Sequence, residues 1–132
     1  MRYGKILAIL LFSISIANAD DCRSFRYSAI ITSVHDGDTV TAQIKLGLNV
    51  VLFEKKVQLF GIDAPEIYGK DKEKGIKARN RLRQLVNGRI IVLRTIEDKI
   101  DESGGILAVI LLDGFSINDR LVAEGFAKFR QY

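Results

Sequence analysis

Two short acidic segments carry the residues best suited to chemistry in this sequence. The first is the run Asp36-Gly37-Asp38-Thr39, and the second is Asp63-Ala64-Pro65-Glu66. Carboxylate oxygens are the ligands that Ca²⁺ prefers, and a carboxylate can also take a proton from a water molecule. Each segment alone is common, because Asp-Gly forms turns and Asp-x-Pro-Glu often follows a strand. If the fold brings the two segments together, Asp38, Asp63 and Glu66 would form a site for a hard cation of the calcium type.

The composition limits the kind of protein to which these carboxylates can belong. The chain has 132 residues, of which 48% are hydrophobic and 27% charged, with a single Cys and a single His. This composition predicts one globular domain and excludes disordered, collagen-like and disulfide-rich proteins. One Cys and one His cannot build a Cys/His zinc site within one chain. We interpret Cys22 as a lone thiol, with an intermolecular disulfide as the alternative, and His35 as an exposed residue at a strand end.

The first nineteen residues have the features of a secretory signal. Arg2 and Lys5 precede an apolar stretch over residues 6–16, and Ala17-Asn18-Ala19 supplies the small residues of a cleavage site. The apolar stretch is shorter than the roughly 20 residues that a membrane-spanning helix needs. We therefore expect cleavage after Ala19 and a secreted or periplasmic mature protein with no membrane partner. Removal of the signal leaves only a small excess of basic residues, so a nucleic-acid partner has to be inferred from a site and not from net charge.

The apolar pattern predicts five strands and two helices in the rest of the chain. Runs of β-branched and aromatic residues indicate strands, and the spacing of Ala78, Leu82 and Leu85 indicates an amphipathic helix. In chain order, the predicted elements are strands 27–34, 39–46 and 50–60, a helix 72–86, strands 89–96 and 106–112, and a short helix over 116–125. This order matches the OB-fold, a mainly β, five-stranded Greek-key barrel with a helix between its third and fourth strands. We expect one such barrel over residues 20–132, present as a monomer.

The two acidic segments, read with their flanks, resemble the staphylococcal (micrococcal) nuclease or thermonuclease family. The matching stretches are VHDGDTV at 34–40 and VQLFGIDAPE at 57–66. The similarity continues through 75–79, 107–110 and 118–127, which resemble the first helix, the fifth strand and the second helix of that family. The resemblance implies a secreted, Ca²⁺-dependent phosphodiesterase that acts on DNA and RNA.

The resemblance also implies a role for each residue of the two segments. Asp38, Asp63 and the backbone carbonyl of Ala64 match the metal ligands, and Asp36 would be an outer ligand. Glu66 matches the general base. This combination is chemically coherent, because Ca²⁺ contacts a phosphate oxygen while a carboxylate orients or deprotonates the attacking water.

Two positions depart from the family pattern. The family has an arginine five residues before its Asp-x-Pro-Glu aspartate and another three residues before the alanine of its fifth strand; here these positions are Gln58 and Gly105. Such arginines stabilise the charge of the phosphoryl transition state, and loss of one donor costs roughly 10² to 10⁵ in rate. Arg130 is a candidate replacement and a candidate nucleic-acid contact, and the alternative interpretation is a solvated terminal side chain. Arg94 and Lys99 are further candidates.

These observations leave three functions open. The first is a secreted Ca²⁺-dependent nuclease of this family, strongly impaired by the changes at Gln58 and Gly105. The second is a catalytically inactive OB module that binds single-stranded nucleic acid or another anionic ligand. The third is a structural or partner-binding secreted domain. Lys74, Lys77 and Arg81 form a basic helix face that we interpret as solvated surface, with phosphate tracking as the alternative.

Overall fold

The computed structural model describes residues 24–100 and 103–131, and the side chains of 97–99 are not described. The predicted signal segment, its cleavage site, Cys22 and the side chain of Lys99 therefore lie outside the described residues. No helix in the described part of the chain has the length and apolar character needed to cross a membrane.

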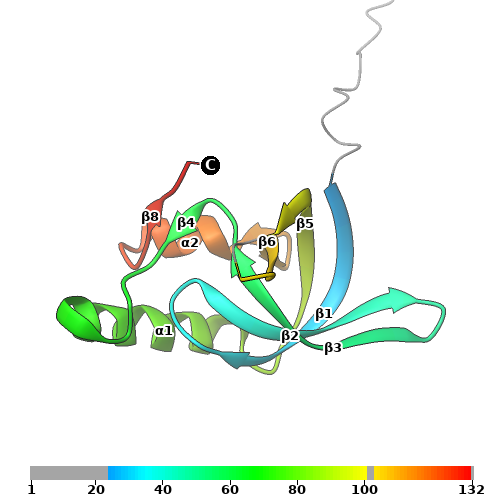
Figure 1. The fold of residues 1–132 in the computed structure, drawn as a ribbon, viewed down its shortest axis with the longest axis horizontal. Coiled ribbons are helices and arrows are strands. Elements are labelled where there is room, and N and C mark those ends of the chain that lie inside the picture. Colours follow the sequence, from blue (N-terminus) through cyan, green and yellow to red (C-terminus); the bar gives the residue numbers. More distant parts are fainter. Residues whose placement is uncertain (1–23, 101–102, 132) are drawn as a thin grey trace, which may run out of the picture.

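The strands close into a barrel. β1 (Ser24–Val34), β2 (Thr39–Gly47) and β3 (Val50–Leu59) form an antiparallel meander, and β5 (Ile90–Ile100) pairs with β1 on its other side. β6 (Ile106–Leu112) pairs antiparallel with β5 and parallel with β3, so the ring is complete (Figure 1). The predicted five-stranded barrel, with a helix between its third and fourth long strands, is confirmed.

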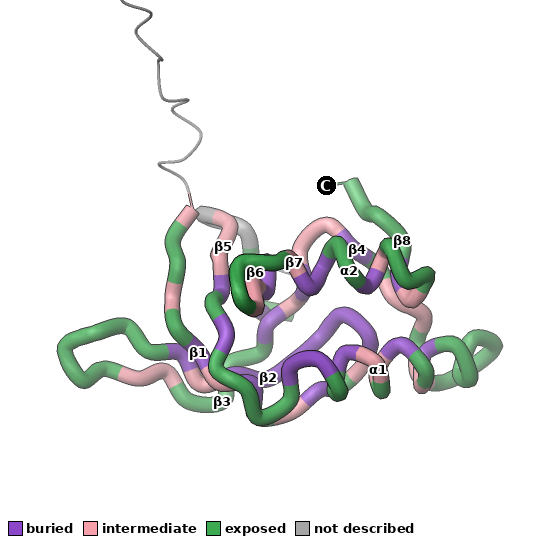
Figure 2. Tube along the Cα trace, turned by 180° about the vertical axis from the view of Figure 1, so that it is seen from behind, coloured by how far each residue is buried: buried purple, intermediate pink, exposed green. Residues whose placement is uncertain are grey.

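Two helices cover the part of the barrel that lies near the acidic segments. α1 (Lys72–Val86) buries Leu82, Leu85 and Val86 against the barrel core and ends as predicted. α2 (Ile117–Ala123) starts at Ser116, whose hydroxyl oxygen accepts a hydrogen bond from the backbone N–H of Asp119 at 3.1 Å, an N-cap. The buried positions form one continuous core between the barrel and both helices (Figure 2).

Several short elements were not predicted from the sequence. The two-residue strands β4 (Ile62–Asp63) and β8 (Lys128–Phe129) pair with each other, and β7 (Phe115–Ser116) pairs with β6. Strands of two residues are too short to show a period-2 pattern. A 3₁₀ turn over Gly69–Asp71 leads into α1. The fourth predicted strand was also too short, because β5 continues to Ile100, which pairs with Ile106.

One buried amide joins β6, α2 and the start of β4. Asn118 is 2% exposed, and its Oδ1 accepts a hydrogen bond from the backbone N–H of Ile110 at 3.1 Å. Its Nδ2 donates to the carbonyl oxygens of Phe60 at 2.9 Å and Ala108 at 3.3 Å. The Asn118 side chain thereby ties β6 to Phe60, three residues before Asp63, and helps to fix the position of the second acidic segment.

Candidate active site

The first acidic segment forms the turn between β1 and β2. The backbone N–H of His35 donates to the carbonyl of Thr39 at 2.9 Å, and the backbone N–H of Asp38 donates to Oδ1 of Asp36 at 3.0 Å. The Asp36 side chain therefore holds the turn in shape, as aspartate does in many tight turns. His35 is exposed, as predicted, and its Nε2 lies 2.6 Å from Oγ1 of Thr41.

The fold brings Asp38 against the second acidic segment. The Asp38 side chain is only 7% exposed, and its Oδ2 accepts a hydrogen bond from the backbone N–H of Ala64 at 2.8 Å. The backbone carbonyl of Asp38 accepts from the N–H of Leu59 at 2.8 Å, which fixes the turn to the end of β3. Asp38 and Ala64 are 26 positions apart in sequence but make this contact, which is the convergence that the barrel topology predicts.

The electrostatic environment of Asp38 disfavours its negative charge. Burial is the largest cause, followed by a hydrogen bond to Asp36 and the charge of Asp36; together they raise the pKa of Asp38 from 3.8 to about 7. The hydrogen bonds from Ala64 N–H and the Thr39 hydroxyl act in the opposite direction. Two carboxyl groups held this close, one of them buried, form a donor set that a bound cation would stabilise. Carboxylate oxygens are of the chemical type that a hard divalent ion takes as ligands.

Asp63 and Glu66 lie beside this contact on an open hollow. Both side chains are exposed. Asp63 in β4 lies opposite Lys128 in the antiparallel pairing of β4 with β8. The hollow has a volume of about 480 Å³ and is lined by Asp63, Ala64, Pro65, Glu66, Asp71, Lys74 and residues 125–128. Within residues 24–100 and 103–131, no three His, Cys, Asp or Glu side chains are grouped closely enough to hold a metal ion by themselves. The ligand set of Asp38, Asp63 and the Ala64 carbonyl therefore stays a prediction.

The second acidic segment and everything after it match a known family. A family model described as staphylococcal nuclease homologue matches residues 56–132, more than half of the chain. The chain belongs to the staphylococcal nuclease family. No curated protein matches it. The first acidic segment precedes the matched region, and it is the Asp38 to Ala64 contact that places it at the same site.

The first departure from the nuclease family pattern lies at this site. Oε1 of Gln58 is 3.0 Å from Oγ1 of Thr39, and the same hydroxyl is 3.1 Å from Oδ1 of Asp38. A hydroxyl has one proton, so Thr39 serves one of these acceptors at a time. The side chain at position 58 thus reaches the carboxyl cluster, but it carries no positive charge there.

The second departure, Gly105, is a buried residue at the start of β6. It precedes Ile106, which pairs with Val57 of β3, and the next residue of β3 is Gln58. The two positions where the nuclease family has arginine are therefore on neighbouring strands, and neither supplies a cation.

The candidate replacements for those arginines differ in their placement. The backbone N–H of Arg130 donates to the carbonyl of Gly61 at 2.8 Å, so this exposed residue runs beside the strand that ends in Asp63. Arg94 pairs with Arg26 across β5 and β1 and follows the buried Leu93, which places it on the outer face of the barrel. Of these two, Arg130 is the residue that the fold brings to the second acidic segment.

Arg79 of α1 is a partly buried basic residue that was not predicted as part of the site. Its Nε is buried and has no hydrogen-bond partner in the structure. Arg79 follows Gly75 by four residues and therefore lies on the helix face that packs on Glu66. The small residues Gly75 and Ala78 were the available signal, because they mark the face of α1 that approaches other backbone closely.

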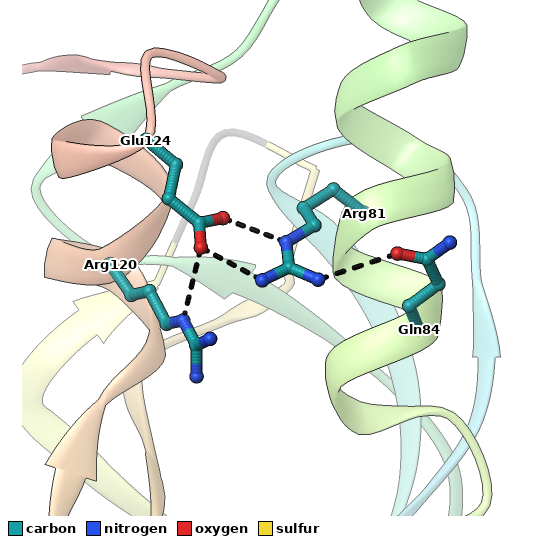
Figure 3. Close-up of polar contacts among 4 residues, drawn as sticks. All are labelled: Arg81, Gln84, Arg120 and Glu124. Atoms are coloured by element: carbon teal, nitrogen blue, oxygen red, sulfur yellow. Dashed lines mark hydrogen bonds and ion pairs between the residues drawn. The ribbon is translucent and has the colours of Figure 1, made fainter.

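The basic face of α1 is partly engaged within the protein. Nε and Nη2 of Arg81 donate to the two carboxylate oxygens of Glu124 at 2.7 and 2.8 Å, and Arg120 Nε donates to Glu124 at 3.2 Å (Figure 3). The hydrogen bond from Arg81 lowers the pKa of Glu124 to about 2. Arg81 therefore joins α1 to the end of α2, and the interpretation of a purely solvated face is corrected for this residue.

Two glycines allow the acidic segments and α1 to approach one another. A Cβ on Gly37 would lie 2.7 Å from the Cβ atoms of both Ala64 and Ala78. A Cβ on Gly75 would lie 2.0 Å from the carbonyl oxygen of Glu66. A glycine inside a helix costs about 1 kcal/mol relative to alanine, so Gly75 weakens α1 locally and permits the contact that positions Glu66.

Gly75→Ala is expected to destabilise the protein by about 3 kcal/mol, because the new methyl group meets backbone that cannot move independently. Urea unfolding followed by circular dichroism measures this change. Asn80→Ala, at an exposed position of the same helix, is the matched control and should leave the stability unchanged or slightly raised. A Gly75→Ala protein as stable as the wild type would show that α1 does not approach Glu66 this closely.

Proposed function

We propose that this protein is an exported, Ca²⁺-dependent nuclease that hydrolyses phosphodiester bonds in DNA or RNA at a low rate. The observation that carries the proposal is the buried Asp38 carboxyl group, held against the backbone of Ala64 next to Asp36. Without a bound cation, ionisation of this buried carboxyl group opposes folding. Membership of the nuclease family supports the same conclusion.

The residues of the site have separate tasks in this proposal. Asp38, Asp63 and the carbonyl of Ala64 would hold Ca²⁺, with Asp36 as an outer ligand. The ion supplies positive charge that polarises a phosphate oxygen of the substrate. Glu66 is exposed on the hollow beside Asp63, where its carboxylate orients a water molecule and takes a proton from it as the water attacks phosphorus.

The low rate follows from the uncharged groups at positions 58 and 105. In the transition state of phosphoryl transfer, negative charge accumulates on the non-bridging oxygens, and fixed cations stabilise it more than they stabilise the substrate. Gln58 contributes at most a hydrogen bond from its amide. The chain therefore retains carboxylates for the metal and the water while it lacks the arginines that accelerate the reaction.

Cleavage of single-stranded DNA and RNA by purified residues 20–132 tests the proposal. Activity is expected with Ca²⁺ and not with chelator, and Glu66→Gln should lower the rate about 100-fold without changing the stability, because position 66 is exposed. Asp71→Asn, on the same hollow, is the matched control and should retain activity. Cleavage that survives both chelation and Glu66→Gln would reject the proposed site.

A binding module is the second candidate, and the uncharged Gln58 side chain at the carboxyl cluster favours it. A folded sample that shows no cleavage under any condition but binds a fluorescent oligonucleotide would support this candidate. Fluorescence anisotropy with and without Ca²⁺ measures that binding directly.

A further inference from the structure

The β2–β3 hairpin extends beyond the barrel. β1 pairs with β2 only as far as Ala29 opposite Ile44, and β6 pairs with β3 only over residues 57–59. Beyond the Ile44–Leu52 pair, residues 45–51 pair only with one another. Figure 1 shows the hairpin directed away from α1 and the C-terminal end, and Figure 2 shows it exposed along most of its length. It is thus remote from the candidate active site and takes no part in the mechanism above.

The tip of this hairpin is apolar. Leu48 is 99% exposed, Leu46 and Val50 flank it at 43% and 50% exposure, and Phe53 follows at 64%. Leucine is also a costly residue at this turn, because Leu48 has a φ of 50° and a bulky side chain in the left-handed region costs about 1 kcal/mol or more. Glycine or asparagine would form the same turn without that cost. Burial within the chain does not offset this cost, because the Leu48 side chain is almost fully exposed.

Positive charge lies along the hairpin between its apolar tip and its base. Residues 45–56 contain three lysines, Lys45, Lys55 and Lys56, against the single acid Glu54. Lys45 is opposite Val51, one step behind the tip, and Lys56 donates to Ser103 at the base of the hairpin. Lysine can keep its ammonium group among polar head groups while its alkyl chain lies along apolar surface.

The observations favour a lipid surface over a second copy of the chain. A stable protein interface buries about 1,200–2,000 Å² in total, more than four apolar side chains at a hairpin tip can supply. A symmetric pair of hairpins would also bring like-charged lysines together. A bilayer requires neither a matching surface nor a large area, because a few apolar side chains enter the interface and cations contact anionic lipid.

We propose that the β2–β3 hairpin docks on anionic phospholipid bilayers, with Leu46, Leu48 and Val50 among the head groups and Lys45 on lipid phosphate. This proposal is independent of the nuclease proposal. It differs from the expectation of no membrane partner, which was based on the lack of a spanning segment; a peripheral contact needs no such segment. Docking at this position leaves the acidic segments facing away from the lipid.

Vesicle sedimentation tests the proposal with residues 20–132, which contain every described element and lack the apolar signal. Wild type is expected to pellet with phosphatidylcholine vesicles that contain phosphatidylglycerol, and much less with phosphatidylcholine alone. Leu48→Asn should weaken binding about tenfold, because one buried leucine is lost, while asparagine suits the turn and keeps the protein folded. Lys45→Gln should weaken binding about fivefold, and this loss should disappear in high salt.

Phe115→Ser is the matched control, because Phe115 is an exposed aromatic residue on a different turn. It should bind vesicles like the wild type. Equal binding by wild type and Leu48→Asn would overturn the proposal, and so would absence of binding to the anionic vesicles. A Leu48-dependent dimer in analytical ultracentrifugation without vesicle binding would also overturn it, in favour of a second copy as the occupant.

Discussion

Asp38→Asn is expected to stabilise the metal-free protein at about pH 8 and to abolish its response to Ca²⁺. In the wild type, burial and the neighbouring Asp36 raise the pKa of Asp38 to about 7, so ionisation at higher pH opposes folding. A pKa raised from 3.8 to about 7 corresponds to a loss of at most about 4 kcal/mol of unfolding free energy when Asp38 is ionised. We expect Asp38→Asn to recover about half of this loss, because asparagine accepts the hydrogen bond from Ala64 N–H less strongly than a carboxylate does.

The sign of the pH dependence follows from the raised pKa. Between about pH 4 and 7 the folded protein binds the Asp38 proton more tightly than the unfolded chain does, so stability falls as the pH rises through this range. Below about pH 4 the carboxyl is protonated in both states, and the full stability is present. Asp38→Asn should remove this part of the pH profile, and the wild type and the variant should therefore converge in acid.

Thermal unfolding with chelator and with Ca²⁺, at several pH values, measures both effects. Added Ca²⁺ should raise the Tm of the wild type by mass action and leave that of Asp38→Asn unchanged. Asp113→Asn, at an exposed turn whose left-handed φ asparagine tolerates, is the matched control. If Asp38→Asn were less stable than the wild type in chelator at about pH 8, the carboxyl would be a structural group and the fit to a cation would fail.

The convergence of the two acidic segments was predictable from the sequence, because it depends on topology. Once five strands in Greek-key order are assigned, the turn before β2 and the end of β3 must lie close together, and the bond between Asp38 and Ala64 realises that proximity. The helix bounds were also predictable, since the apolar spacing over 72–86 and the stop at Asn87-Gly88 are strong local signals.

The energetics of the site were not predictable, because they depend on burial. Nothing in the sequence distinguishes Asp38, which is 7% exposed, from the exposed Asp63. The orphan Nε of Arg79 and the pairing of Arg81 with Glu124 are likewise tertiary facts, since a helical pattern shows only which residues are polar. The β2–β3 hairpin was predicted as part of the barrel wall, and only the strand pairings show how far it projects.

Gln58→Arg is expected to raise the rate of Ca²⁺-dependent cleavage about 10³-fold. Position 58 reaches the carboxyl cluster through Thr39, so an arginine here places a fixed cation beside the proposed phosphate position. The Thr39 hydroxyl is then released to donate to Asp38 alone. A donor that acts on the transition state contributes about 10² to 10⁵ in rate, and the gain should appear in kcat more than in KM.

A control must separate this effect from a general gain in affinity for polyanions. Gln43→Arg adds the same charge on β2 opposite Ile30, away from the carboxyl cluster, and should lower KM slightly without raising kcat. Glu66→Gln combined with Gln58→Arg should lose the gained activity, because both groups serve the same reaction. A gain in kcat that survived Glu66→Gln would place the chemistry elsewhere.

The remaining outcome is that Gln58→Arg binds oligonucleotide more tightly but shows no turnover at all. In that case the site would lack more than its arginines. The barrel would then be a binding module whose carboxylates hold metal without catalysing cleavage.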